Sequence, residues 1–258
     1  MSTPADGDRT LRGAAAVVTG GGSGIGAATV ELLVERGARV LIVDRDHDAG
    51  AAVAARTGQS FVHADVGVPA DWQVVGSVAA TLGRLRYVHL NAGVNSGRQG
   101  APIDELADDR LFGALAVNLG GVILGVRELA PLLRGAGGGG GAGGSVLVTA
   151  SLAALGPFPA DPVYAATKAG VVGFVRSVAR QLDRDGIRIN VLCPTATDTP
   201  MMGADDRARL ARAGVTVVPA GVMAAAAVTC LTHPGTGQVF RCDDHTGPQR
   251  VPVPQMGD

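Results

Sequence analysis

A tyrosine and a lysine stand four positions apart in the segment YAATK, at Tyr164 and Lys168. Residues with this spacing project from one face of a helix, so the Lys168 ammonium can lie beside the Tyr164 phenol. A nearby cation favours the phenolate, and we therefore expect Lys168 to lower the phenol pKa from its usual value of about 10. Tyr164 is then expected to act as a general acid–base. On its own, a Tyr–Lys pair at this spacing is more typical of a solvated helix surface.

A serine lies 13 residues before the tyrosine, where Ser151 ends the apolar run SVLVTAS. Its hydroxyl can bind the oxygen of an alcohol or ketone and hold it beside the phenol. A serine in this place can also simply cap the loop that follows. The three side chains together, and none of them alone, predict acid–base chemistry on a carbon-bound oxygen.

A glycine-rich loop, TGGGSGIG, follows the apolar run AAAVVT and opens a predicted helix. Glycines in such a loop allow a tight turn, a close approach to a pyrophosphate and close packing of the helix on the strand, and the helix N-terminus favours the phosphates. A plain turn is the alternative, but the position after the first strand favours dinucleotide binding. The residues predicted to hold the pyrophosphate are Gly20, Ser23, Gly24, Ile25 and Gly26.

An acidic residue ends the second predicted strand, where Asp44 stands 18 residues after Gly26. A carboxylate here can accept hydrogen bonds from both adenosine ribose hydroxyls and would repel a 2′-phosphate. The loop offers Ser23 and no Lys or Arg to such a phosphate, so the predicted cofactor is NAD. Arg45 could help to bind NADP instead, and Asp44 could be a solvated acid in the run DRDHD.

With the triplet Asn91-Ala92-Gly93 and with Asn118, these motifs follow one another in an order that resembles the short-chain dehydrogenase/reductase family. The similarity is to its single-domain branch, which carries TGxxxGxG and YxxxK, and it runs from about residue 13 to residue 201. It implies that Asn118, Ser151, Tyr164 and Lys168 are the catalytic residues. In that family the lysine also binds the nicotinamide ribose, and the asparagine supports a water chain that relays protons.

The resemblance assigns further residues to the cofactor. Asp65 and Val66 match the pair that flanks adenine, and Asn91, Ala92 and Gly93 line the cofactor along the fourth strand. After the sixth strand the matching positions are Pro194, Thr197 and Thr199. The chain departs from the family pattern at Leu90, where a second asparagine is common, and at Thr195, where a glycine is usual. The lost glycine is expected to restrict the backbone near the nicotinamide.

Short β-branched runs alternate with longer helical stretches along the chain. The predicted strands are Ala14–Thr19, Arg39–Asp44, Ser60–Ala64, Tyr87–Asn91, Ser145–Ser151, Arg188–Cys193 and Gln238–Arg241. The predicted helices are Gly24–Arg36, Ala49–Thr57, Asp71–Leu82, Asp104–Leu133, Tyr164–Asp183 and Pro219–Leu231, with a possible early end of the fourth near Pro131. Apolar strands separated by helices predict an α/β fold: a Rossmann-like, doubly wound parallel sheet of about seven strands in a three-layer α/β/α arrangement.

Nothing breaks this rhythm, so residues 1–258 are predicted to form a single dinucleotide-binding oxidoreductase domain. Residues 1–10, the glycine-rich loop 135–144 and the Pro-rich tail 243–258 are expected to be flexible. The glycine-rich run GAGGGGGAGG is expected to be a solvated connector and not a phosphate site, because no strand precedes it and no helix follows it.

The composition excludes several classes of protein. A net charge of −1 offers no basic surface to nucleic acid or to anionic membrane, and no uninterrupted apolar run reaches the length of a membrane span. Three cysteines outside any CxxC pair indicate reduced thiols in a cytoplasmic protein. The five histidines form no metal-ligand pattern, so no metal site is expected and the tyrosine must perform the acid–base work.

The predicted function is NAD-dependent oxidation of a secondary alcohol to a ketone. The substrate pocket is expected beyond the strand C-termini, with walls at 94–98, 152–162 and 200–218. Apolar residues stand in these walls at Leu152, Leu155, Phe158, Met201 and Met202, and no cluster of Arg or Lys offers itself for a phosphate or a CoA tail, which favours a neutral cyclic, terpenoid or steroid alcohol. The alternatives are an NADPH-dependent ketoreductase, a non-catalytic dinucleotide-binding regulator and, least favoured, a scaffold protein. The resemblance implies a homotetramer, or else a homodimer, that pairs the helices at 104–133 and 164–183.

Overall fold

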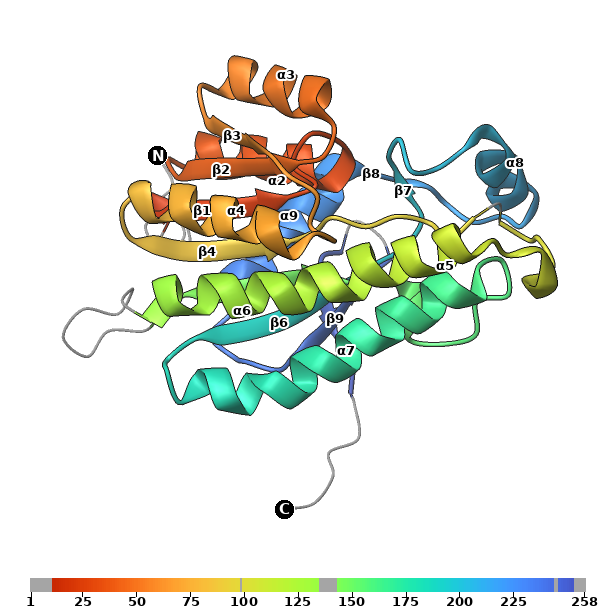
Figure 1. Ribbon diagram of the computed structural model, residues 1–258. Helices are drawn as coiled ribbons and strands as arrows, with labels where there is room; N and C mark the ends of the chain where they lie inside the picture. Colours follow the sequence, from red (N-terminus) through yellow and green to blue (C-terminus); the bar gives the residue numbers. More distant parts are fainter. Residues whose placement is uncertain (1–10, 98, 135–142, 244–245, 253–258) are drawn as a thin grey trace.

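The computed structural model describes residues 11–97, 99–134, 143–243 and 246–252, and Figure 1 shows their arrangement. One sheet of eight strands forms the centre of the molecule, in the order β10-β9-β6-β5-β4-β1-β2-β3. The strands are β1 (Ala15–Thr19), β2 (Arg39–Asp44), β3 (Ser60–His63), β4 (Leu85–Leu90), β5 (Ser145–Thr149), β6 (Arg188–Pro194), β9 (Val239–Cys242) and β10 (Gln249–Arg250). All pairs are parallel except β9 with β10. The predicted parallel α/β sheet is therefore confirmed.

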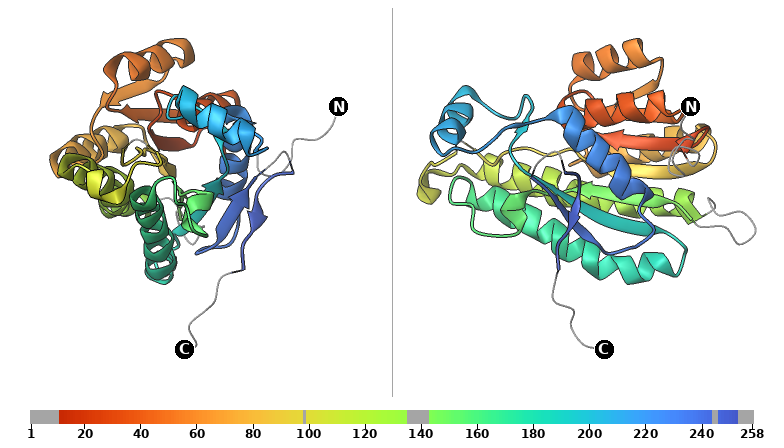
Figure 2. Two further views of the ribbon diagram at one scale, coloured as in Figure 1. Left: turned by 90° about the vertical axis from the view of Figure 1, so that its right-hand side faces the viewer. Right: turned by 180° about the vertical axis from the view of Figure 1, so that it is seen from behind.

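Helices cover both faces of the sheet and complete three layers (Figures 1 and 2). On one face lie α2 (Gly24–Glu35), α3 (His47–Thr57) and α9 (Ala220–Thr232). On the other lie α4 (Pro69–Thr81), α5 (Asp108–Leu115), α6 (Gly121–Arg134) and α7 (Pro162–Asp183). Each face has its own apolar core, because the strands carry buried side chains on both sides. The sheet is thus a rigid platform whose strand ends can hold loops in fixed places.

The predicted long helix at 104–133 consists of several elements. A short 3₁₀ turn, Ile103–Glu105, precedes α5, and a π-helical turn, Ala116–Gly120, joins α5 to α6. Pro131 lies inside α6, which continues to Arg134 because Leu129 and Leu133 are anchored in the core on either side of it. The run Asp108–Arg134 is long and apolar enough to cross a membrane by composition, with a mean hydropathy of 1.4. Here its inner face packs on the sheet, which accounts for its buried apolar residues.

Four of the helices and strands were not predicted. The helix α8 (Ala204–Arg212) stands beside the carboxyl ends of the strands, on the side that the left view of Figure 2 faces. The strands β7 (Thr197–Asp198) and β8 (Val218–Pro219) form a small parallel pair before and after it. The fourth is β10, which pairs with β9 through Gln249 and Arg250, so this part of the predicted loose tail is ordered as an edge strand. The other predicted flexible positions, 1–10, 135–142, 244–245 and 253–258, lie outside the described residues.

Candidate active site

A cavity of about 1310 Å³ opens at the carboxyl ends of the strands. The strand order reverses at this edge, with β1 between β2 and β4, and such switch points are where doubly wound sheets bind ligands. The predicted site residues that line the cavity are Gly20, Ser23, Gly24, Ile25, Asp44, Arg45, Asp65, Val66, Asn91, Ala92, Gly93, Ser151, Tyr164, Lys168, Pro194, Thr197 and Thr199. Gly26 and Asn118 lie behind its wall. Sequence motifs that are far apart in the chain therefore meet at one place.

The glycine loop between β1 and α2 is packed too closely for larger residues. A Cβ atom on Gly26 would lie 1.9 Å from the carbonyl oxygen of Gly20, so α2 rests directly on the loop. Gly24 has a φ of +51°, and a Cβ there would lie 2.8 Å from Cγ2 of Thr199. The segment after β6 thus leans on the loop. A flat backbone surface with the start of α2 at its edge fits the pyrophosphate of a dinucleotide.

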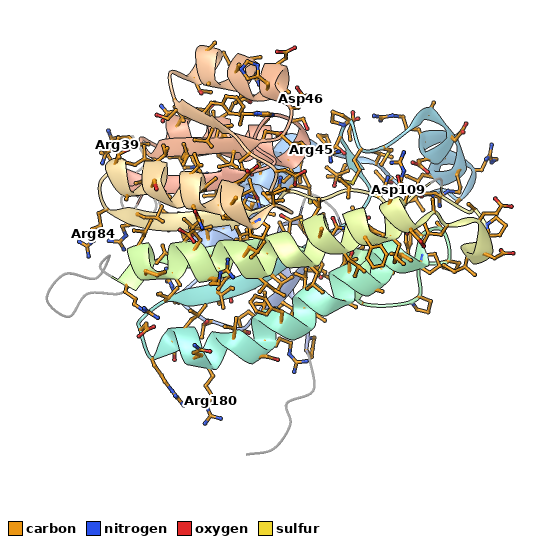
Figure 3. The ribbon with its side chains drawn as sticks, viewed as in Figure 1. Arg39, Arg45, Asp46, Arg84, Asp109 and Arg180 are labelled. Atoms are coloured by element: carbon orange, nitrogen blue, oxygen red, sulfur yellow. The ribbon has the colours of Figure 1, made fainter. Side chains whose placement is uncertain are left out.

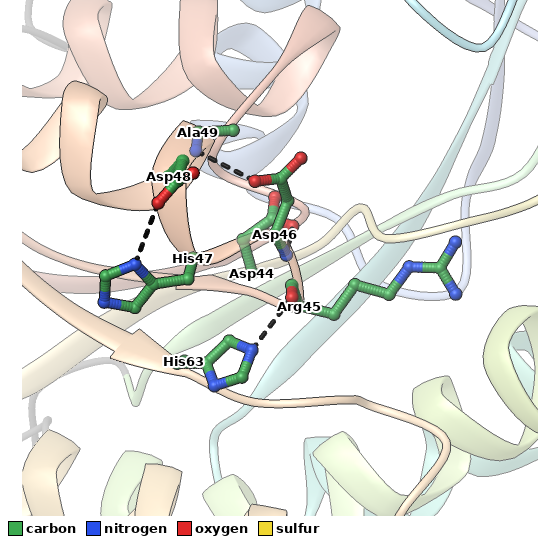
Figure 4. Close-up of polar contacts among 7 residues, drawn as sticks. All are labelled: Asp44, Arg45, Asp46, His47, Asp48, Ala49 and His63. Carbon is green, nitrogen blue, oxygen red and sulfur yellow. Dashed lines mark hydrogen bonds and ion pairs between the residues drawn. The ribbon is translucent and has the colours of Figure 1, made fainter.

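Asp44 is held in place at the end of β2. Its Oδ2 accepts a hydrogen bond of 2.8 Å from the backbone N–H of Gly22, and its Oδ1 accepts one of 2.9 Å from Asp46. Figure 4 shows the turn that follows, in which Asp46 caps α3 by accepting from the N–H of Ala49 at 3.0 Å. The side chain of Arg45 extends away from this turn, while its carbonyl oxygen lies 2.9 Å from Nε2 of His63. The Asp44 carboxylate therefore faces the cavity in a fixed orientation.

Backbone and side-chain hydrogen bonds fix the ends of the neighbouring strands. Thr19 Oγ1 accepts from the N–H groups of Asn91 and Ala92 at 2.9 and 3.1 Å, which joins the end of β1 to the segment after β4. Asp65 donates its N–H to Asp71 at 2.8 Å and accepts from the N–H of Gly67 at 2.8 Å. The positions matched to adenine and nicotinamide thus lie along one continuous wall of the cavity. The residues present fit an extended dinucleotide.

Ser151, Tyr164 and Lys168 come together where this wall meets the rest of the cavity. Ser151 ends the segment after β5, Tyr164 and Lys168 lie on α7, and a side-chain hydrogen bond links Ser151 to Tyr164. Lys168 Nζ lies 5.6 Å from the centre of the Tyr164 ring and donates to the carbonyl oxygen of Thr149 at 3.0 Å. The spacing-based expectation that the three side chains share one site is met by this geometry.

The ionisation of the tyrosine differs from the expectation. Burial raises the Tyr164 pKa to about 12, and the hydrogen bond from Ser151 opposes this only in part. Burial also lowers the Lys168 pKa to about 8, because the cavity wall removes water from the ammonium. The prediction that Lys168 would bring the phenol pKa below its usual value is therefore wrong for the protein without ligands. Desolvation by burial is the largest cause of the direction of the shift.

Asn118 has a structural position. Its side chain is fully buried in the π-helical turn, where Oδ1 accepts from Val94 N–H at 2.8 Å. Its Nδ2 donates to the Val94 carbonyl at 2.9 Å and to Oγ1 of Thr167 at 3.0 Å. Both N–H donors and the oxygen of this amide have a partner, so the side chain positions the segment after β4 against α7. The assignment of Asn118 to the catalytic set stays a prediction, and these contacts show that its side chain also positions the segment after β4.

The residue that replaces the usual glycine does not distort the segment after β6. Among the described residues, positive φ angles occur only at glycines, so Thr195 adopts an ordinary backbone conformation. Its N–H donates to the carbonyl of Cys242 at 2.9 Å, and Thr197 Oγ1 donates to the Thr195 carbonyl at 2.9 Å. A threonine at position 195 is therefore compatible with the backbone conformation of this segment.

The other end of the cavity carries more polar groups than predicted. Apolar residues line it at Leu152, Phe158, Met201 and Met202, but Leu155 does not face it, and Arg98 lies outside the described residues. Its remaining lining includes Gln99, Glu105, Arg110, Asp206 and Arg209. Arg209 on α8 donates to the Gln99 side chain across the opening and forms a 3.3 Å ion pair with Asp206. In Figure 3, Arg45 and Asp109 mark this open edge of the sheet, whereas Arg39 and Arg84 lie at the opposite edge.

Sequence reasoning missed several residues that hold the site. The Thr149 carbonyl accepts a hydrogen bond from the Lys168 ammonium. The Oγ1 atom of Thr149 lies 2.8 Å from His89 Nε2 and donates to Asn91 Oδ1 at 3.1 Å. Asp161 caps α7 by accepting a hydrogen bond from the Tyr164 N–H. The sequence does carry a signal for this cap, because Asp161-Pro162 is a favoured pair at the start of a helix. The residues described here include no group of His, Cys, Asp and Glu placed to hold a metal ion.

Comparisons with known proteins agree with this geometry. A family model described as short chain dehydrogenase matches residues 14–233. Momilactone A synthase of Oryza sativa subsp. japonica is 38% identical over 208 residues, which cover 78% of this chain and 74% of that protein. The mitochondrial borneol dehydrogenase of Lavandula x intermedia is 33% identical over 202 residues, covering 77% and 74%. The crystal structure of 3-ketoacyl-(acyl-carrier-protein) reductase from Brucella melitensis complexed with NADH superposes with a TM-score of 0.81 at 28% identity, over 90% of this chain and 97% of that one. This chain belongs to the short-chain dehydrogenase/reductase family of oxidoreductases.

Proposed function

We propose that this protein is an NAD-dependent dehydrogenase that oxidises a neutral, fairly apolar secondary alcohol to a ketone. The observation that carries the proposal is the meeting of Ser151, Tyr164 and Lys168 in the cavity that Asp44 also faces. Hydride acceptance would be supplied by the nicotinamide of the cofactor when bound. The acid–base groups belong to the chain, and they lie at the junction of the cofactor wall and the apolar wall.

The chain's own residues divide the work. Ser151 donates a hydrogen bond to the substrate oxygen and holds it beside the Tyr164 hydroxyl. In oxidation the Tyr164 phenolate takes the alcohol proton as hydride leaves the carbon, and in reduction the phenol returns that proton. Lys168 stands beside the phenol as a cation and is oriented by the Thr149 carbonyl at 3.0 Å. Oxidation needs the Tyr164 phenolate, and positive charge nearby favours it. The positively charged nicotinamide of bound NAD and the Lys168 ammonium would therefore both favour the phenolate.

The preference for NAD rests on Asp44. Its carboxylate is held by two backbone N–H groups at 2.8 and 2.9 Å, so it cannot readily turn away from a 2′-phosphate. The affinities for NADH and NADPH, measured by fluorescence titration, are expected to favour NADH by at least about tenfold. An Asp44→Ser variant should lose much of that ratio, and an Asp48→Ser variant on the exposed side of the same turn should keep it. Equal affinities in the unmodified protein would contradict the proposal.

The substrate class is supported by Leu152, Phe158, Met201 and Met202, which form an apolar wall beside Tyr164. Two relatives are named for work on terpenoid-like compounds, namely borneol dehydrogenase and momilactone A synthase. The test is an NAD-reduction screen at 340 nm over cyclic, terpenoid and steroid alcohols, with short polar alcohols and sugars as comparison. Turnover confined to the polar set would overturn the apolar class, and turnover that survives Tyr164→Phe would overturn the mechanism.

A second candidate, an NADPH-dependent ketoreductase, is favoured by two observations. Arg45 is exposed next to Asp44 and lines the cavity, so it can approach a 2′-phosphate. The raised pKa of Tyr164, caused by burial, keeps the phenol protonated and ready to donate to a ketone. Under this alternative NADPH binds more tightly than NADH, and Arg45→Ala removes the difference. The affinity measurement above therefore separates the two candidates directly.

We also propose an oligomeric state and a cellular location for the protein. The outer faces of α5 and α6 expose Phe112, Leu115 and Ile123, at 64%, 38% and 40%. Apolar residues exposed along helices favour burial against another copy, so we propose a homotetramer, or a homodimer, that pairs α5, α6 and α7. Light scattering should give the mass of the oligomer, and Phe112→Asp should reduce it. The three cysteines are buried and form no disulfide, which suits a reducing compartment such as the cytoplasm, and fractionation of the source cells would test this location.

A further inference from the structure

A buried aspartate begins the helix that carries the tyrosine and the lysine. Asp161 is 4% exposed and is the N-cap of α7, with Pro162 in the first helical position. Its Oδ1 accepts a hydrogen bond of 2.9 Å from the backbone N–H of Tyr164. A carboxylate in this place satisfies a free helix donor and is stabilised by the helix dipole. The residue therefore sets where the first turn of α7 begins.

The same carboxylate also binds the segment that follows β4. Its Oδ2 accepts from the backbone N–H of Ser96 at 2.9 Å, and its Oδ1 accepts from Ser96 Oγ at 2.5 Å. Ser96 is itself only 5% exposed, so this contact is shielded from water. A charged acceptor with short bonds to buried donors is stronger than a neutral one. Asp161 thus joins two parts of the chain that are 65 residues apart.

The segment that Asp161 holds is part of the cofactor wall. It begins at Asn91, Ala92 and Gly93 and continues through Val94, which Asn118 ties to Thr167 on the next turn of α7. The cofactor wall is therefore fastened to α7 at two levels. Asn118 provides a neutral fastening near Lys168, and Asp161 provides a charged one near Tyr164.

We propose that Asp161 is a positioning residue of this active site, which locks the Tyr164 turn to the cofactor wall and places a carboxylate at the start of the helix that carries the phenol. It is not a catalytic residue, because its carboxylate oxygens are occupied by Ser96 and by the Tyr164 backbone. Its effect on turnover rests on the proposed function. Its effect on the ionisation of Tyr164 does not, because that ionisation can be measured without substrate.

The charge has a defined direction of action. Burial is the largest cause of the raised Tyr164 pKa, the hydrogen bond from Ser151 lowers it, and Asp161 and Cys193 raise it further. The other charged group that faces the phenol is Lys168, 5.6 Å from the ring centre. A neutral residue at 161 should therefore let the phenol lose its proton at a lower pH. Oxidation, which needs the phenolate, should then reach its plateau at a lower pH.

The chain contains two tyrosines, Tyr87 and Tyr164, which makes the ionisation directly observable. In a Tyr87→Phe background, the tyrosinate absorbance near 295 nm reports Tyr164 alone, and circular dichroism on the same samples checks that the chain stays folded. Asp161→Asn keeps the cap to Tyr164 but removes the charge. We expect it to shift the titration to lower pH by about 0.5 to 1 unit. Ser96→Ala removes one bond to the carboxylate and keeps the charge, so its titration should stay within about 0.2 units of the parent.

Each outcome decides the proposal. A downward shift with Asp161→Asn, absent in Ser96→Ala, supports it. A titration that is unchanged or moves upward with Asp161→Asn overturns it, as does an equal shift with Ser96→Ala, which would assign the effect to packing. Should the asparagine variant not fold, Asp161→Ser supplies a smaller neutral cap with the same expectation. Once an alcohol substrate is known, the rising limb of kcat/KM for oxidation should move with the titration. Failure of the alcohol screen would leave the absorbance result intact.

Discussion

The two halves of the cavity are built in different ways. The cofactor half is made of backbone packed against backbone, as at Gly26, where a Cβ would lie 1.9 Å from the Gly20 carbonyl. The substrate half is closed by side chains that reach across an opening, as Arg209 does to Gln99 and as Asn95 does to the Met201 carbonyl at 3.3 Å. In the cofactor half even one added carbon atom would clash with the backbone, whereas in the substrate half a side chain can move without disturbing the fold.

This difference suggests how one scaffold can keep its cofactor and change its substrate. Backbone contacts in the cofactor half depend on glycines and on strand ends, which the sheet holds rigid. The walls of the substrate half belong to α8 and to loops, which few core contacts restrain. We therefore expect substitutions in the first half to affect folding and cofactor affinity together, and substitutions in the second to affect substrate alone.

Tyr164 lies where the two halves meet, and its loss should give the largest effect. Tyr164→Phe removes the acid–base group and should lower kcat by about 10² to 10⁴, while the affinity for NADH stays within about twofold. Steady-state kinetics and a fluorescence titration measure the two quantities. Tyr87→Phe, the other tyrosine of the chain, is the matched control and should keep its activity. A fall in NADH affinity as large as the fall in kcat would show that the two halves are not separable here.

Gly26→Ala tests the rigidity of the cofactor half. The added Cβ meets backbone atoms that cannot turn aside, so the free energy of unfolding should fall by about 2 to 4 kcal/mol, and NADH should bind at least about tenfold more weakly. Denaturant unfolding and titration with NADH measure both. Gly221→Ala on α9 is the control, because a Cβ there has nothing within 4 Å. Equal behaviour of the two variants would remove the basis for calling this half rigid.

A buried histidine, His89, lies in β4 beneath the cofactor half. Burial lowers its pKa from 6.5 to about 3, so the unfolded chain takes up a proton below about pH 6.5 that the folded protein refuses until about pH 3. The free energy of unfolding should therefore fall as the pH is lowered through this window, by about 3 kcal/mol from this residue between pH 6.5 and pH 4.5. Denaturant unfolding at pH 7 and at pH 4.5 measures the loss.

The histidine effect has a direct control. His89→Gln should make stability less dependent on pH over the same window, and His47→Gln, which replaces an exposed histidine on α3, should not. The same pH dependence in His89→Gln and in the parent protein would assign the loss to other groups.

The substrate half should give the smallest effect. Arg209→Ala removes the contact to Gln99, and we expect the KM for the alcohol to change by about three- to tenfold, with NADH affinity unchanged. Arg212→Ala changes the same helix outside the cavity and should leave both values as they are. A loss of NADH affinity in Arg209→Ala would show that the contact between Arg209 and Gln99 also affects cofactor binding.

The sequence was most informative where local chemistry decides the structure. Apolar strands and the glycines at 20, 24 and 26 predicted the sheet and the loop, because few other conformations bury such strands or suit such glycines. The four-residue spacing of Tyr164 and Lys168 gave their shared face. These features depend on neighbours along the chain, so a pattern in one sequence is enough to find them.

The remaining features depend on neighbours in space. The polar contacts of Gln99 with Arg209 and of Ser96 with Asp161 join distant segments, and no spacing announces them. The ionisation of Tyr164 was misjudged because a sequence shows the nearby lysine but not the water that burial removes. The helix α8 was missed because it lacks an apolar stripe: none of its residues is buried.

The π-helical turn at Ala116–Gly120 gives the long helical run an exact length requirement. Each residue of an α-helix turns the chain by about 100°, so removing one residue from this turn would rotate α5 relative to α6 by about that angle. Such a rotation would carry Asn118 away from Val94 and would turn Phe112 and its exposed neighbours towards a different direction. A single-residue deletion here would therefore change the active site and the outer surface at once, although all the residues of α5 and α6 would still be present.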